Sequence, residues 1–343
     1  MSGQPLFKPA ILMLAIVVIS LLSWELYLRN CGVSIDYDDG PPNWADKRAM
    51  VYEPSDKTVV FIGSSRIKFD LDLDTWQDLT GTYPVMLAIE GNSPRPVLDD
   101  LADDPKFNGR LVIDVTEGLF FSNSPHDVGK PKKNIQYYKD QTPAQWAGFQ
   151  LNYPLESQFV FLDEDNFSLN AMLDQLEIPS RPGVFMFPIF PREFNRKTFG
   201  RQSKMSDSFL ADTSQQNKVR GIWAFFRKID KSPPIADEGI AEVLASVKTA
   251  TDKIKARGGE VLFVRTPSSG PFLIGEAQAF ARERFWNPLL ATTGCTGIHF
   301  ADYPGMSHFE CPEFSHLTPK DAVLFTRELV TAMKQDKGWK FLK

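Results

Sequence analysis

An unbroken apolar stretch near the N-terminus, PAILMLAIVVISLLSWELYL from residue 9 to residue 28, limits the architectures open to this chain. A helix needs roughly 20 apolar residues to cross a bilayer core about 30 Å thick, and this stretch has that length. It carries a single charged side chain, Glu25. No small-residue cleavage site of the kind that ends a signal peptide follows it. We therefore predict a retained membrane-spanning helix within residues 1–29.

The charges that flank this stretch indicate its orientation. Lys8 precedes it, whereas Arg29 and then the acidic sequence SIDYDDG follow it. Positive charge favours the cytoplasmic side, so we expect the N-terminus in the cytoplasm and the rest of the chain outside the cytoplasmic membrane. Cys31 does not indicate a lipoprotein, because LRNC lacks the small residues expected before a lipidated cysteine.

The three cysteines leave one question open. An exported protein with three cysteines has an odd thiol, and an oxidising compartment would permit a disulfide between Cys295 and Cys311, which are close in sequence. The alternative is that both are small buried apolar side chains. The sequence does not decide between them, because it does not give the distance between their Cα atoms.

The composition excludes several classes of partner and cofactor. With 343 residues, 43% of them apolar and 24% charged, the chain can bury a substantial core. Its net charge of -5, without a long basic run, argues against nucleic-acid binding. Neither H-E-x-x-H nor paired C-x-x-C occurs, and DLDLD at residues 70–74 lacks the glycine and glutamate of a calcium loop. We predict no metal and no cofactor.

Beyond the first 29 residues the sequence is typical of an α/β protein. Residues 30–57 are rich in turn formers and charge and are expected to be a linker. The domain is expected over residues 58–343, where short apolar runs alternate with amphipathic segments. This pattern predicts a mostly parallel sheet with helices on both faces. The expected strands are 58–62, 85–89, 111–115, 260–265 and 297–300, and the clearest helices are 238–257 and the one that Thr318 caps.

The segment from about residue 122 to residue 235 interrupts this alternation. It contains KPKKNIQYYKDQTPAQW, the proline-broken apolar sequence RPGVFMFPIFPREF and a polar run over residues 201–218. We expect a partly helical insertion that packs as a cap over the edge of the sheet where the strands end. Its aromatic side chains would form core or line a sugar-binding groove, and the sequence leaves both open.

The sequence VVFIGSSRIKF, residues 59–69, places two serines directly after the first expected strand, where ligands bind in such folds. A serine becomes a nucleophile when a base accepts its proton and a third group orients that base. Three of the four histidines lie in an expected strand or in polar loops: His126, His299 and His308. His316 lies in CPEFSHLTPKDA, three residues after Glu313 and just before the last helix. These two residues are therefore the candidate base and orienting group for Ser65.

Together, GSS after the first strand, the glycine of LAIEGNSP after the second, and EFSHL before the last helix resemble the motifs of the SGNH (GDSL-type) hydrolases, most closely their membrane-tethered, extracytoplasmic branch. The resemblance covers about residues 58–122 and 258–335. It implies a flavodoxin-like three-layer α/β/α sandwich with Ser65 as nucleophile, His316 as general base and Glu313 in the aspartate position of D-x-x-H. The backbone amides of Ser65 and Gly91 would stabilise the oxyanion.

Two positions depart from the family's pattern. The G-x-N-D block should follow the third strand, where this chain reads DVTEGLFF. The oxyanion donor of that asparagine is therefore missing unless Asn92 or Arg66 replaces it. In the first motif, Ser64 stands in place of aspartate.

The resemblance implies a membrane-anchored serine esterase or O-acyltransferase that acts on acyl esters of an extracytoplasmic glycan or a similar ester. The missing asparagine favours transfer, which would imply a membrane acyltransferase as partner. The alternative is a non-catalytic scaffold or glycan-binding protein that keeps the fold and has lost the chemistry.

Overall fold

The computed structural model describes residues 7–52, 58–174, 176, 188–231 and 233–343. Parts of the predicted linker and insertion therefore lie outside the described residues. The chain forms two compact units. One consists of Met1–Asp38 and Pro143–Met186, and the other of Asp39–Thr142 and Phe187–Lys343.

The second unit is built on a five-stranded sheet in which all neighbouring strands are parallel. The strand order is β2-β1-β3-β6-β7, and with these five strands counted in sequence it is the order of flavodoxin-like sheets. The predicted α/β sandwich is confirmed, and each predicted strand overlaps an observed one, although the strand expected over residues 85–89 covers only Val85–Met86. The strands are β1 (Val59–Ile62), β2 (Val85–Met86), β3 (Arg110–Asp114), β6 (Glu260–Arg265) and β7 (Thr296–His299).

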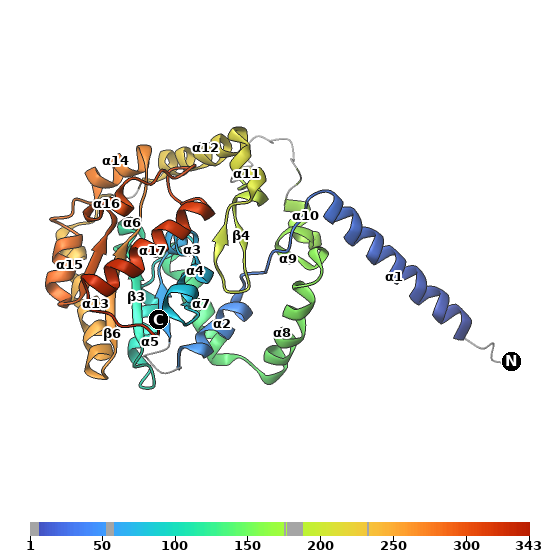
Figure 1. Ribbon diagram of the computed structural model, residues 1–343, viewed down its shortest axis with the longest axis horizontal. Helices are drawn as coiled ribbons and strands as arrows, with labels where there is room; N and C mark the ends of the chain where they lie inside the picture. The colour runs from blue at the N-terminus through green and yellow to red at the C-terminus, as the bar shows by residue number, and fades with distance from the viewer. Residues whose placement is uncertain (1–6, 53–57, 175, 177–187, 232) are drawn as a thin grey trace. The chain divides into compact units, whose positions relative to one another are not determined.

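Helices cover both faces of this sheet (Figure 1), which explains why its strands are continuously apolar. In β1, Val60 and Ile62 join one core, whereas Val59 and Phe61 join the other. The first core is closed by α2 (Pro41–Ala49), α5 (Arg95–Asp103), α13 (Asp237–Ala256) and α15 (Trp286–Thr293), with α7 (Pro125–Asp140) against α2 and α5. The second core is closed by α3 (Ser65–Asp70), α4 (Leu73–Thr80), α16 (Pro304–Ser307) and α17 (Pro319–Gln335). Two further helices, α6 (Glu117–Phe120) and α14 (Gly270–Ala279), follow β3 and β6.

Local side-chain caps begin several of these helices. The Thr318 hydroxyl accepts a hydrogen bond from the Asp321 N–H over 3.1 Å at the start of α17, so the predicted cap is confirmed. Asp72 caps α4 in the same way, with Oδ1 2.9 Å from the Thr75 nitrogen. The acidic sequence DLDLD therefore begins a helix. That helix ends at Gly81, whose φ of 84° favours glycine.

The prediction of a linker over residues 30–57 is wrong for residues 39–52, and residues 53–57 lie outside the described residues. The two prolines that suggested a turn instead open α2, a position where a missing N–H costs nothing. Trp44 of this helix is fully buried in the first core. Arg48 is also buried and pairs with Asp100 over 2.8 Å. These contacts make α2 part of the sheet unit.

Cys295 and Cys311 do not form the disulfide that the sequence left open, and both are free thiols. Cys295 belongs to the core on one face of the sheet, and Cys311 belongs to the core on the opposite face. The sheet therefore separates two residues that are close in sequence. Both act as small buried apolar side chains.

The predicted insertion does not form one body. Residues 143–176 group with the N-terminal helix, whereas residues 188–231 belong to the sheet unit. The latter contain the hairpin of β4 (Arg196–Lys197) and β5 (Ser203–Lys204), followed by α11 (Asp207–Ala211) and α12 (Thr213–Ile229). They bury a small apolar cluster against Phe69 of α3, made of Phe194, Met205, Phe209 and Val219.

The first unit contains α1 (Phe7–Asn30), which is long and apolar enough to cross a membrane. It also contains α8 (Pro143–Glu156), α9 (Glu164–Phe167) and α10 (Leu169–Asp174). The Glu25 carboxylate accepts hydrogen bonds from Arg29 Nε over 2.6 Å and from the N–H groups of Val160 and Phe161 over 3.1 and 3.3 Å. The charge within the apolar stretch is thus paired inside the protein.

Candidate active site

The change of direction in strand order between β1 and β3 brings two loops together at the carboxyl edge of the sheet, where ligands bind in such folds. Ser64 follows β1, and its Oγ lies 3.2 Å from Oδ2 of Asp114, the last residue of β3. The same Oγ lies 2.8 Å from Oγ1 of Thr116, two residues further on. Gly63 permits this approach, because a Cβ there would lie 2.5 Å from the Asp114 Cβ. Ser65 begins α3 beside this junction and is partly exposed among buried neighbours.

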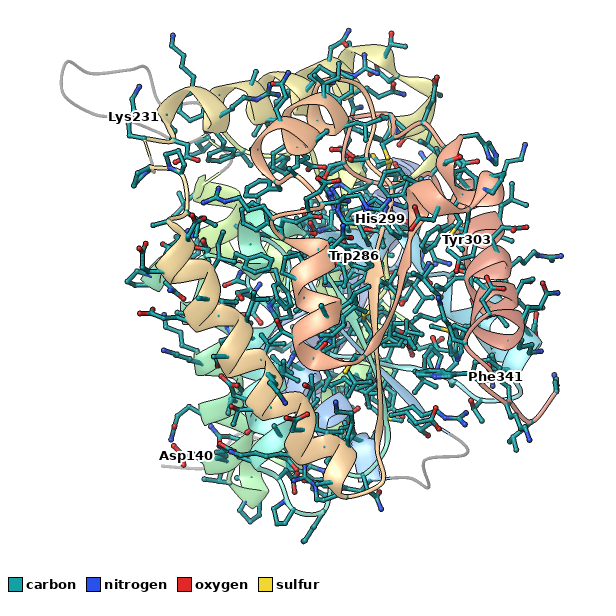
Figure 2. All side chains as sticks on the ribbon, turned by 90° about the vertical axis from the view of Figure 1, so that its left-hand side faces the viewer. Asp140, Lys231, Trp286, His299, Tyr303 and Phe341 are labelled. Atoms are coloured by element: carbon teal, nitrogen blue, oxygen red, sulfur yellow. The ribbon has the colours of Figure 1, made fainter. Side chains whose placement is uncertain are left out.

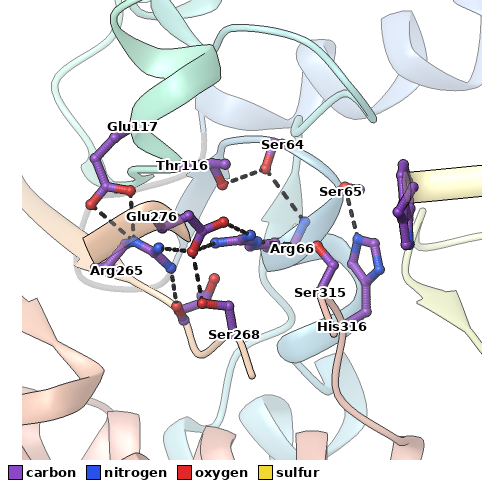
Figure 3. A network of polar contacts seen from close by, with 12 residues as sticks. Ser64, Ser65, Arg66, Thr116, Glu117, Arg265, Ser268, Glu276, Ser315 and His316 are labelled. Carbon is purple, nitrogen blue, oxygen red and sulfur yellow. Dashed lines mark hydrogen bonds and ion pairs between the residues drawn. The ribbon is translucent and has the colours of Figure 1, made fainter. Parts of the chain in front are cut away.

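Ser65, His316 and Glu313 form one hydrogen-bonded series, although 251 residues separate the serine from the histidine. His316 Nε2 lies 2.9 Å from Ser65 Oγ (Figure 3), and Nδ1 lies 2.9 Å from Glu313 Oε1. Both distances fall in the range of about 2.6–3.2 Å over which a base exchanges a proton. With the imidazole proton on Nδ1, Nε2 can accept the proton of the serine. The structure therefore brings together the three residues that the motifs selected.

The Glu313 carboxylate is held by several donors. It is fully buried, and Oε1 accepts from the N–H groups of Ser315 and His316 over 3.2 and 2.6 Å. Oε2 accepts from the indole Nε1 of Trp223 over 2.5 Å. Because both oxygens are fixed, the carboxylate can hold the imidazole ring in one orientation.

An aromatic wall surrounds the His316 ring, which is 1% exposed. The ring centroid lies 4.4 Å from that of Phe69, 5.7 Å from that of Phe194 and 6.3 Å from that of Trp223. Phe194 and Trp223 come from the described part of the predicted insertion. Within residues 188–231 this segment therefore packs over the base, as expected of a cap.

A buried ionic network lies on the other side of the serine loop (Figure 3). Arg66 forms a bidentate pair with Glu276 of α14, and its Nε lies 3.3 Å from Ser315 Oγ. Arg265, at the end of β6, donates to the same carboxylate over 2.6 Å and to both oxygens of Glu117 over 3.0 and 2.9 Å. The network thus joins α3, α6, α14 and β6 around the site.

Two buried carboxyl groups here have pKa shifts of opposite direction. Burial raises the pKa of Asp114, and the nearby charges of Arg66 and Arg265 oppose the increase only in part. Burial also opposes ionisation of Glu276, but there the same two arginines prevail and lower the pKa to about 2. Glu276 is therefore the ionised partner of the two arginines at neutral pH.

Two of the groups expected to stabilise an oxyanion are the backbone N–H groups of Ser65 and Gly91. Gly91 has a φ of 64°, and no atom lies within 4 Å of where its Cβ would be, so its conformation rather than crowding requires glycine. Among the described residues, the N–H groups of Ser65 and Gly91 have no hydrogen-bond acceptor. The Asn92 side chain instead donates to the Glu90 carbonyl over 2.7 Å, and the Arg66 guanidinium is engaged by Glu276. Both side chains that could replace the missing asparagine are therefore already engaged within the protein.

A further carboxyl group is buried next to the base. Asp70, at the end of α3, accepts from the Leu317 N–H over 2.9 Å through Oδ1, while Oδ2 is buried with no partner in the described structure. Burial raises the pKa of Asp70 well above its ordinary value, and the Leu317 N–H opposes this. A protonated Asp70 satisfies this environment better than a carboxylate does.

The remaining histidines do not reach the serine. The ring of His299, at the end of β7, packs edge-to-face against that of Trp286 (Figure 2), with 5.3 Å between the ring centroids. Burial lowers the pKa of His299 to about 3. It accepts a hydrogen bond from the Ala301 N–H over 3.2 Å, as a neutral imidazole does. His126 and His308 are exposed, the former inside α7 rather than in the predicted loop.

The sequence did not identify Trp223, Glu276, Arg265 or Asp70 as neighbours of the site. The contact of Trp223 with Glu313 joins residues 90 apart, and that of Arg66 with Glu276 joins residues 210 apart. No local motif marks such pairs. The sequence offers one signal for them. Arg265 ends an apolar strand and Glu117 follows another, and the ends of parallel strands lie at one edge of the sheet.

No family model matches the chain, and no curated protein is significantly similar to it. The chemistry of the site therefore rests on its own geometry. A hydroxyl, an imidazole and a carboxylate in series form the arrangement that activates a serine for attack on an acyl group. Across the described residues, no group of three or more histidine, cysteine or acidic side chains is arranged to hold a metal ion.

Proposed function

We propose that this protein is a membrane-anchored serine esterase or O-acyltransferase of the SGNH type, acting on acyl esters of an extracytoplasmic glycan. The observation that carries the proposal is the series from Ser65 Oγ through His316 to Glu313, with 2.9 Å at each of its two contacts. The position of this series beside the β1/β3 junction and the apolar helix α1 give further support. The cytoplasmic membrane and an extracytoplasmic domain are part of the proposal.

In the first half of the reaction, Ser65 Oγ attacks the ester carbonyl while His316 Nε2 accepts its proton. The backbone N–H groups of Ser65 and Gly91 donate to the oxyanion of the tetrahedral intermediate. Collapse of the intermediate breaks the bond to the alcohol oxygen, which takes the proton from His316 and leaves. The product is an acyl group on Ser65, with Glu313 having held the imidazolium throughout.

In the second half an acceptor hydroxyl attacks the acyl-serine, and His316 removes its proton. Water as acceptor gives hydrolysis, and a sugar hydroxyl gives transfer. Ser65 Oγ then recovers its proton from the imidazolium. The two activities share every residue and differ only in the acceptor, so product analysis with and without a glycan acceptor distinguishes them.

A fluorophosphonate probe tests the nucleophile on the full-length protein in neutral detergent. Wild type is expected to be labelled and Ser65→Ala to be unlabelled. Ser307→Ala, which removes an exposed hydroxyl at the end of α16, is expected to be labelled like wild type. The same samples should show ester hydrolysis in parallel with labelling.

Absence of labelling in folded wild type, or equal labelling of Ser65→Ala, would contradict the proposal. If such a protein still bound glycan, it would be a scaffold or glycan-binding protein that has kept the fold. The missing asparagine after β3 makes this the alternative to be tested.

A further inference from the structure

An open groove lies between α12, the first turn of α14 and the loop that precedes His316. It has a volume of about 440 Å³, within the range of about 300–1,000 Å³ found for small-ligand sites. Its cationic wall is formed by Arg220, Arg227 and Lys228 of α12. The rest of the lining is apolar, and includes Pro271 and Phe314.

Arg220 and Arg227, two of the three cations of this groove, contact neutral groups of the protein. Arg220 donates to the Pro312 carbonyl and to Asn217 Oδ1, both neutral acceptors, over 2.9 and 3.0 Å. Arg227 lies over the ring of Phe272, with 5.6 Å between the guanidinium carbon and the ring centroid. Among the described residues, no carboxylate pairs with Arg220, Arg227 or Lys228 and none lines the groove. Within the part of the chain that the structure describes, the groove therefore presents positive charge with no paired carboxylate.

Both walls of the groove also adjoin the series of Ser65, His316 and Glu313. Trp223, which donates to Glu313, lies on α12 one turn from Arg220 and Arg227. Phe314 lies between Glu313 and His316, and it adopts a φ of 79° that is unusual for a non-glycine residue. The Phe314 ring packs against Gly270 so closely that a Cβ at position 270 would lie 2.8 Å from it. On its other contact, the Arg220 guanidinium carbon lies 4.9 Å from the ring centroid. The ring is thus fixed on the groove side of the loop.

We propose that this groove binds an anionic group of the substrate, so that the acyl-bearing glycan is a polyanion rather than a neutral polymer. This inference rests on the proposed function, because it names the substrate class of the same site. Guanidinium groups match the geometry of both carboxylate and phosphate oxygens. The anionic group is therefore a uronate carboxylate or a backbone phosphodiester, and the experiment compares the two.

The experiment uses the full-length protein in neutral detergent and three acetylated polymers: a polyuronate, a polymer with phosphodiester links and a neutral glucan. For wild type, kcat/KM is expected to be higher on one of the two anionic polymers than on the glucan. In Arg227→Ala/Lys228→Ala, both of whose side chains are exposed, the ratio of anionic to neutral kcat/KM should fall about tenfold, as expected for two solvent-screened contacts. The anionic polymer that shows the fall identifies the group.

The matched control removes two cations from another helix. Lys248→Ala/Lys253→Ala on α13 loses the same charge and should keep the wild-type ratio, which excludes an effect of net charge. A second readout does not require catalysis: Ser65→Ala should bind the deacetylated polyanion, and Ser65→Ala/Arg227→Ala/Lys228→Ala should bind it about tenfold more weakly.

The outcomes separate this inference from the proposed function. Equal ratios and equal polyanion binding with and without Arg227 and Lys228 would overturn the inference and leave the esterase intact. Charge-dependent polyanion binding by a wild-type protein that cleaves no ester would support the groove and overturn the proposed function.

Discussion

Among individual side chains, Trp223 is the least expected contributor to the site. Its indole N–H donates to Glu313 Oε2, and its ring stands beside the imidazole. Trp223→Phe keeps an aromatic ring and removes the donor. A hydrogen bond to a charged group contributes about 1.5–3 kcal/mol, so we expect kcat/KM for ester cleavage to fall about tenfold or more.

The control for this prediction is Trp146→Phe, which changes an exposed tryptophan of α8. Steady-state ester cleavage should distinguish the two variants. If Trp223→Phe retained wild-type kcat/KM, the indole would only fill space and Glu313 would not depend on it.

Asp70 provides a prediction about stability and pH. Its pKa in the folded state is raised by burial, so above its unfolded pKa the unfolded chain releases a proton that the folded protein retains. Stability from this group is therefore lost as pH rises above the ordinary aspartate range. Asp70→Asn keeps an oxygen for the Leu317 N–H and removes the ionisation, so the variant should be more stable than wild type at neutral pH.

Urea unfolding of wild type and Asp70→Asn at a series of pH values measures this effect. The advantage of the variant should shrink as pH is lowered toward about 3.8, the ordinary value for aspartate. If the difference in free energy of unfolding between Asp70→Asn and wild type did not change with pH, Asp70 would ionise as readily in the folded protein as in the unfolded chain.

Motifs were sufficient to select Ser65, His316 and Glu313, because a family resemblance fixes residues by their place at the ends of strands and helices. They were not sufficient for Trp223 or Asp70. Trp223 lies in the insertion, which the resemblance does not cover. Asp70 belongs to the acidic sequence DLDLD, and nothing local shows that α3 carries it into the core.

Among the helices and strands, α14 is joined to the sheet by charge. It has no fully buried residue, and Glu276 links it to Arg66 of α3 and Arg265 of β6. Because the pKa of Glu276 is lowered from 4.5 to about 2, its ionised form stabilises the folded state. That stability is complete above about pH 4.5 and is lost as pH falls through about 2.

Glu276→Gln should therefore lower the free energy of unfolding at neutral pH by about 3 kcal/mol, the equivalent of this pKa shift. The difference from wild type, measured by urea unfolding, should narrow as the pH is lowered below 4.5. Glu283→Gln changes an exposed glutamate that follows α14 and serves as control. A constant difference at all pH values would show that Glu276 contributes by packing and not by charge.

The five strands could be predicted because a strand buried on both faces is continuously apolar, and this pattern is local. The hairpin of β4 and β5 has two residues in each strand and polar side chains, so no such pattern marks it. Helix α2 was mistaken for a linker because its prolines and charges are also those of a turn. Its burial depends on Trp44 and Arg48 reaching partners elsewhere in the unit, which the sequence of the helix does not show.

At the scale of the whole molecule, chemical labelling of the Cys31 thiol tests which side of the membrane the domain occupies. Cys31 follows α1 and is exposed, whereas Cys295 and Cys311 are buried. If the domain lies outside the cytoplasmic membrane, a membrane-impermeant maleimide added to intact cells should label wild type and not Cys31→Ala. Labelling of wild type only after the cells are opened would place the domain in the cytoplasm and contradict the proposed localisation.

The site itself depends on the order in which the strands and helices of the sheet unit are connected. Residues near positions 65, 116, 265 and 316 meet because parallel strands end at one edge, whatever their separation in sequence. This much follows from the fold class alone. The aromatic wall does not, because it requires the insertion to return to the sheet unit after residue 187.

The most direct test of the account is the location of the acyl group after reaction with an activated ester. The full-length protein is mixed with 4-nitrophenyl acetate, quenched in acid and digested, and the peptides are mapped by mass spectrometry. We predict one acetyl group on Ser65 that is absent from His316→Gln. Acetylation confined to lysines, or equal acetylation of Ser65 in His316→Gln, would show that the imidazole does not activate this serine.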